Sequence, residues 1–125
     1  MKSADVANFI DRSPRKEMVA VRRQTAVSPQ TWVNAVVPAC VRQYGAAELV
    51  GGILQGDFEV IVAHSALAEA GFPVPPKDGD RVVRNPTIVD GEFVPGGGVT
   101  LTVKHPGDRG GAIGYWMQAR GGGVG

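Results

Sequence analysis

The chain has 125 residues, enough for one domain with its own hydrophobic core, and 43% of the residues are hydrophobic. Its 18 glycines and 9 prolines favour turns, loops and β-structure over a helix bundle. A formal net charge of +1 and a single cysteine argue against a dedicated nucleic-acid binder, a disulfide framework and a zinc site built from several thiolates. No run approaches 18 apolar residues and the first residues lack the layout of a secretory signal, so we expect a soluble intracellular protein.

Charge is unevenly distributed along the chain. Residues 1–42 carry seven Lys/Arg and three Asp/Glu, residues 43–92 carry three and eight, and residues 93–125 carry three and one. The ends are therefore basic and the middle is acidic. These segments could be solvated faces of a monomer, or they could be complementary surfaces that meet between copies of the protein in an assembly.

The first residues predict a short amphipathic helix followed by a strand. Ser3 begins a segment that can cap a helix, and Val6, Phe9 and Ile10 have the spacing of one helical face, which ends by Pro14. A helix of this length is marginal in water, so it must dock on the rest of the domain. Residues 16–25 alternate as a strand does.

A turn at residues 28–30 leads to a long second strand over residues 31–44, which is rich in β-branched and aromatic residues. Pro38 lies within this strand and has no backbone N–H to donate. We expect it at a sheet edge or at a bulge, where a bulge would let the strand bend around a barrel.

The next strand is predicted over residues 57–63, where Phe58, Val60 and Val62 alternate with Asp57, Glu59 and Ile61. Before it, residues 45–56 combine four glycines with apolar side chains, and each glycine inside a helix costs roughly 1 kcal/mol relative to alanine. This segment is therefore predicted to be a long apolar connection. A stable monomer seldom leaves such residues exposed together. They are Leu49, Val50, Ile53 and Leu54.

Residues 64–71 are expected to form one or two helical turns capped by Ser65. A turn over residues 77–80 then precedes a strand that begins at Arg81, and one or two short strands are expected within residues 81–94.

The last part of the chain predicts a hairpin of residues 99–104 and 114–120, joined by a polar loop, with a flexible tail over residues 121–125. The fold class that follows is mainly β: a small antiparallel β-barrel or sandwich of five to six strands with a short N-terminal helix and long loops. We expect a single domain, in which residues 1–15 form the helix or arm and residues 16–120 form the barrel.

No residues combine into a catalytic or metal-binding motif, so we expect no enzymatic activity, cofactor or metal. His64 and His105 are far apart and lie in no recognisable spacing with Cys40 or a carboxylate. Cys40 is predicted to be a small buried hydrophobe. The turn containing Asp78 and Asp80 lacks the terminal glutamate of a calcium loop. Four residues form a local basic patch that is either a solvated strand edge or a nonspecific phosphate contact: Arg15, Lys16, Arg22 and Arg23.

Three segments carry a resemblance to a known family. They are AELVGGILQGDFEVIV at 47–62, PVPPKDGDRVV at 73–83 and QARG at 118–121, which closes the final hairpin. In these segments the chain resembles the head–tail connector proteins of tailed bacteriophages, of the stopper or head-completion kind. The similarity extends over residues 16–121, and the first segment is the most specific.

The resemblance implies a virion protein that is assembled in the host cytoplasm and forms a homo-oligomeric ring of six or twelve copies in the phage neck. It implies portal and adaptor proteins above the ring, a tail terminator or tail tube below it, packaged DNA held nonspecifically in the channel, and no membrane. It also implies that the connection before the third strand faces the channel as a gate, whose candidate residues here are Glu48, Leu49, Val50, Ile53, Leu54 and Gln55.

Charged and polar positions in the basic end and the loops are candidates for contacts between rings or between copies: Arg15, Lys16, Arg22, Arg23, Asp78, Asp80, His105, Asp108 and Arg109. Two other functions fit a small β-domain. One is a different neck or tail component, such as a tail terminator. The other is an oligonucleotide-binding barrel in which Tyr115 and Trp116 would stack on bases.

Overall fold

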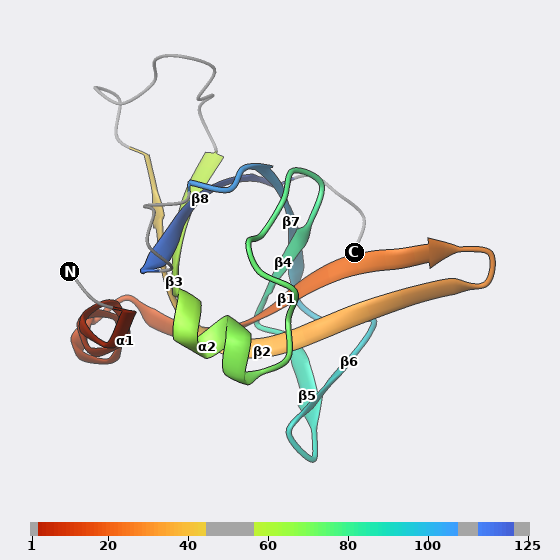
Figure 1. Cartoon of the computed structure of the whole chain (residues 1–125), viewed down its shortest axis with the longest axis horizontal. Coiled ribbons are helices and arrows are strands. Elements are labelled where there is room, and N and C mark those ends of the chain that lie inside the picture. The colour runs from red at the N-terminus through yellow and green to blue at the C-terminus, as the bar shows by residue number, and fades with distance from the viewer. Residues whose placement is uncertain (1–2, 45–56, 108–112, 122–125) are drawn as a thin grey trace.

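The computed structural model of the chain describes residues 3–44, 57–107 and 113–121. Within these residues, two helices and eight strands follow one another in the order shown by colour in Figure 1. Their bounds are α1 Ser3–Arg12, β1 Lys16–Val27, β2 Gln30–Gln43, β3 Asp57–Ala63, α2 His64–Glu69, β4 Arg81–Arg84, β5 Thr87–Val89, β6 Glu92–Val94, β7 Val99–His105 and β8 Gly114–Arg120.

Six of the strands close into an antiparallel barrel in the order β1-β2-β3-β8-β7-β4, and β4 pairs back with β1. The closing ladder joins Val19–Arg22 of β1 to Arg81–Arg84 of β4. Strands β5 and β6 form a separate two-stranded hairpin outside the barrel. The expected mainly-β class is confirmed as a barrel, with this additional hairpin made from the region around Ile88 and Val89.

The barrel interior is filled by side chains that alternate along the strands. The inward-facing residues of β3 are Val60 and Val62, and those of β8 include Tyr115, Met117 and Ala119. Leu67 of α2 and Phe72 belong to the same buried cluster. Every strand of the barrel contributes small or β-branched residues to it, so the barrel has a packed core.

Helix α1 packs on the outer face of the barrel, where it buries Val6 and Ile10 against Cys40, Ile61 and Ala63. The expected docking of this short helix is therefore confirmed. The expected apolar face was wrong in one residue, because the Phe9 side chain is 55% exposed. Val6 and Ile10 are four residues apart and lie one turn above the other, which suffices for this narrow contact.

Two further expectations needed correction or refinement. The predicted Ser65 cap is wrong: helix α2 begins directly after β3, its N-cap is Ala63, and no side chain caps it. Pro38 pairs with Met18 on β1 without a register shift, just beyond the ladder that joins Cys40–Gln43 of β2 to β3. It therefore lies at an unpaired edge, while the bulge is in β1, between Gln24 and Ala26.

The β5–β6 hairpin turns at Asp90 and Gly91, which have φ angles of 53° and 79°. A two-residue loop with positive φ at both positions matches the twist of the strands that it joins, and Asp-Gly is a favoured pair for it. Strand β6 contacts β2, whereas all three residues of β5 are exposed. Within the described residues, no helix is long and apolar enough to cross a membrane.

Candidate functional site

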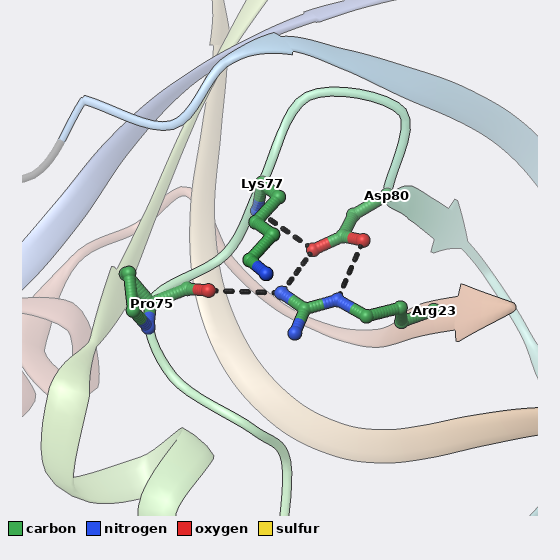
Figure 2. Close-up of polar contacts among 4 residues, drawn as sticks. All are labelled: Arg23, Pro75, Lys77 and Asp80. Atoms are coloured by element: carbon green, nitrogen blue, oxygen red, sulfur yellow. Dashed lines mark hydrogen bonds and ion pairs between the residues drawn. The ribbon is translucent and has the colours of Figure 1, made fainter. Parts of the chain in front are cut away.

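A buried ion pair joins the end of the β1–β4 ladder to the loop before β4 (Figure 2). Arg23 donates from Nε to Asp80 Oδ1 at 3.0 Å and from Nη2 to Asp80 Oδ2 at 2.8 Å. The same Nη2 donates to the carbonyl oxygen of Pro75 at 2.8 Å, and the Lys77 amide donates to Asp80 Oδ2 at 2.8 Å. Asp80 is only 4% exposed, so its charge is balanced inside the chain.

This ion pair also holds residues 72–80 against the barrel. The guanidinium carbon of Arg23 lies 5.1 Å from the centre of the Phe72 ring, and Phe72 is part of the core. The Gly79 amide donates to the Val103 carbonyl at 2.9 Å, which ties the turn to β7. Arg23 and Asp80, which were candidates for contacts between copies, are thus bonded to each other within one copy.

The two strands that lead into and out of residues 45–56 are fixed to the barrel. Asp57, the first residue of β3, is 1% exposed and accepts hydrogen bonds from Arg120 Nε at 2.9 Å, Arg120 Nη2 at 3.1 Å and Gln118 Nε2 at 2.9 Å. Bonding to this carboxylate raises the pKa of Arg120 above its usual range. On the other strand, Arg42 donates to Glu59 at 2.9 Å, across the β2–β3 ladder. Residues 45–56 are therefore flanked by two neighbouring strands whose ends are fixed to the barrel by ion pairs and hydrogen bonds.

A further ion pair joins β1 to β4. Arg84 donates from Nε and Nη2 to the two carboxylate oxygens of Glu17, at 2.8 and 2.9 Å. These hydrogen bonds raise the pKa of Arg84 because they favour its charged form. Basic residues of the N-terminal third thus meet acidic residues of the middle within one barrel, in the pairs Arg23–Asp80 and Arg42–Glu59.

Arg22 lies between two aromatic rings on the outer face of the barrel. Its guanidinium carbon is 4.3 Å from the centre of the Trp32 ring and 4.6 Å from that of Phe93. Its Nε donates to Asn34 Oδ1 at 2.6 Å. Burial lowers the pKa of Arg22, because the rings remove water from the cation. Phe93 belongs to β6, so this stack attaches the β5–β6 hairpin to β1 and β2.

The far part of the β1–β2 hairpin, residues 24–33, extends beyond the rest of the barrel (Figure 1), and we call it the arm. The β1–β4 ladder stops at Arg22, and the β2–β3 ladder does not begin before Cys40. The two strands of the arm are therefore paired only with each other among the described residues. Val27 at its tip is 81% exposed.

No Asp, Glu, Lys or Arg occurs between Arg23 and Arg42. Natural proteins usually protect an exposed strand edge with charges, proline or a bulge. The β1 side of the arm has the bulge between Gln24 and Ala26, whereas the β2 side is regular from Gln30 onward. The β2 edge of the arm is therefore an unprotected strand edge.

The remaining predicted residues are distributed over the surface or lie outside the description. The gate candidates at positions 48–50 and 53–55, together with Asp108 and Arg109, lie outside the described residues. Arg15, Lys16, Asp78 and His105 are exposed, and Lys16 pairs with Asp11 at 2.7 Å. The structure does not bring the four basic patch residues to a common site, because Arg22 and Arg23 point to separate partners.

The structure does not offer Tyr115 as a stacking platform for an oligonucleotide. Tyr115 is 2% exposed and its hydroxyl is 2.8 Å from His64 Nδ1, and a buried ring cannot stack on a base. Trp116 is half-buried and packs against the cluster beneath α1. Cys40 is buried as predicted. Among the described residues, no three His, Cys, Asp or Glu side chains are grouped so that they could hold a metal ion.

Sequence reasoning missed the pairing of Arg22 with Trp32 and the clamp on Asp57. Arg22 and Trp32 are ten residues apart on two strands joined by a short turn, so a predicted hairpin register could have found this contact. Asp57 could be recognised as a charged first residue of a largely apolar strand, but its partner Arg120 lies on a strand that is distant in sequence. Comparison with family models, curated proteins and solved structures gives no match for this chain.

Proposed function

We propose that the chain is a structural subunit of a tailed-phage neck, a head–tail connector of the stopper kind that assembles as a ring below the portal and adaptor. The assignment to the phage neck rests on the resemblance in residues 47–62, 73–83 and 118–121. The observation that carries the assembly role is the arm, an uncharged two-stranded ribbon with an unpaired edge. A strand edge of this kind is a template for pairing with another chain.

The anchored strands around residues 45–56 support a role for this connection as the gate. Asp57 holds the beginning of β3 through Arg120 and Gln118, and the Tyr44 amide lies 3.5 Å from the Asp57 carbonyl oxygen. Because both strands that flank residues 45–56 are fixed, this connection can face a channel without a loss of strand pairing in the barrel. Its four glycines allow a change of backbone conformation at low cost.

In this proposal the ring closes the DNA-filled head and gives the tail a surface on which to dock. The subunit performs no chemical reaction and uses no cofactor. Two of the charges that we expected between copies are instead used within each copy, in the pair Arg23–Asp80. Contacts between copies then depend on main-chain pairing and on exposed apolar residues.

The proposal is tested in the phage that encodes the chain. Particles are made with Ile53→Asp and Leu54→Asp together, and released DNA, tail attachment and infectious titre are measured. We expect heads that lose DNA or that fail to accept tails, because the two carboxylates would repel one another around the ring and repel DNA. The matched control is Ala68→Asp, an exposed position on α2.

A map of the particle neck by electron microscopy provides the second readout. A ring of this barrel between portal and tail supports the proposal. Its absence from the neck, or normal particles from the double variant, would overturn the proposed function or the gate, respectively.

A further inference from the structure

The arm has an unpaired strand edge, and the same chain has a second one in β5. We propose that the β2 edge of the arm in one copy pairs with β5 of the next copy, so that the ring is held together by strand addition. This inference rests on the proposed function, because it takes the assembly to be a ring of identical subunits. The partner is thus a second copy of this chain.

The first step concerns the arm. Its two edges differ, since β1 is bulged between Gln24 and Ala26 while β2 continues in register through Gln30, Thr31 and Trp32. A bulge twists an edge away from further pairing, so the β2 side is the one that can accept a strand. The absence of charge from residues 24–41 removes the usual electrostatic obstacle to this addition.

The second step concerns β5. This strand pairs only with β6, and β6 is the strand of the hairpin that contacts the barrel. The edge of β5 opposite to β6 therefore has no strand partner among the described residues. Thr87, Ile88 and Val89 are all β-branched and all exposed, with Ile88 at 39% and Val89 at 54%. Such residues favour strands and gain from being covered.

The third step concerns symmetry. Figure 1 shows the arm and the β5–β6 hairpin leaving the barrel in different directions, so one copy cannot pair its own arm with its own β5. A contact between two different surfaces is heterologous, and repetition of it generates a ring when the rotation closes. Pairing of two arms with each other would be isologous and would stop at a dimer.

The stack of Arg22 between Trp32 and Phe93 gives this arrangement a rigid base. It joins Trp32 of the arm to Phe93 of β6, so the β2 edge of the arm and the β5–β6 hairpin of one copy are held in a fixed relation. A fixed relation between the two surfaces sets the rotation from one subunit to the next. The ring size then follows from the geometry of a single subunit.

The test uses the full chain with Cys40→Ala, so that introduced cysteines are the only thiols. The double variant Thr31→Cys with Val89→Cys is treated with a short bis-maleimide, both as purified assemblies and in particles. We expect a ladder of cross-linked multimers that ends at the ring size. The matched control replaces Thr31→Cys by Asn8→Cys, an exposed position on α1, which lies at the opposite end of the molecule from the arm (Figure 1), and should give no ladder.

Assembly is measured in parallel by native mass spectrometry of two lysine variants. The Thr25 and Thr31 hydroxyls are 2.7 Å apart, so Thr25→Lys and Thr31→Lys remove the same contact within a copy. We expect Thr31→Lys to raise the dissociation constant of the assembly at least tenfold and Thr25→Lys to leave it unchanged. Circular dichroism should show the same melting temperature for both variants within a few degrees.

The outcomes separate this inference from the proposed function. Intact rings of Thr31→Lys, or a cross-link of Thr31→Cys alone that stops at a dimer, would overturn strand addition to β5 and leave the ring in the neck untouched. Absence of the protein from the neck would overturn the proposed function whatever the cross-links show. A ladder together with dissociation of Thr31→Lys supports both.

Discussion

The barrel body and the arm use opposite means to hold their strands. In the body, ion pairs join strands or loops that are distant in sequence, as in Arg23–Asp80 and Asp57–Arg120. The arm contains no charged residue, and its strands are joined by their own ladder and by the hydrogen bond between the Thr25 and Thr31 hydroxyls. The difference indicates that ion pairs between distant segments fix the body, whereas the arm is held together without charge.

The strongest way to break this contrast is to remove a buried charge from the body. Asp80→Ala should lower the free energy of unfolding by about 3 kcal/mol, because it leaves Arg23 partly buried without its carboxylate. Denaturant unfolding followed by circular dichroism measures the change. Asp78→Ala, an exposed position in the same turn, should change stability by less than about 0.5 kcal/mol. Equal effects of the two substitutions would contradict a structural role for the pair.

A double-mutant cycle on Arg22 and Trp32 measures the strength of the contact at the boundary between body and arm. The single variants Arg22→Gln and Trp32→Leu and their combination should give a coupling energy of about 0.5–1 kcal/mol, as expected for a partly exposed cation over an aromatic ring. Thermal or denaturant unfolding supplies the values. A coupling energy of zero would show that the stack of Arg22 on Trp32 does not stabilise the β1–β2 hairpin. The variant Arg22→Lys tests whether an ammonium group can replace the planar guanidinium.

The smallest effect is expected at the half-exposed pair of Glu17 and Arg84. A cycle of Glu17→Gln and Arg84→Gln should give about 0.5 kcal/mol, since solvent screens both side chains. Added salt should reduce this coupling. A coupling energy as large as the effect of Asp80→Ala would mean that solvent exposure does not determine how much each ion pair stabilises the barrel body.

Much of the fold follows from local patterns in the sequence. The alternation of Val60 and Val62 in β3, and of Leu101 and Val103 in β7, predicts strands that the structure has at those positions. The turn before β4 and the final hairpin are also predicted correctly. These features depend on neighbours within a few residues, which the sequence displays directly.

Other features depend on partners that are distant in sequence. The charge counts of the three segments are visible, but which arginine meets which carboxylate depends on the register of strands such as β1 with β4. That register is set by the whole barrel. Phe9 and Tyr115 were misjudged for the same reason, because burial of an aromatic residue depends on what packs against it. The role of residues 45–56 as a channel gate remains a prediction.

The order of strands in the barrel has a consequence for folding. β1 and β2 are neighbours in sequence and can pair as soon as both exist, whereas closure needs β4, β7 and β8, which come later in the chain. Contacts between residues far apart in sequence form slowly, because the chain must first close a long loop. A partly folded chain therefore exposes the whole β1–β2 hairpin, including the uncharged arm, before the barrel closes. We expect the arm to dominate aggregation during synthesis and refolding.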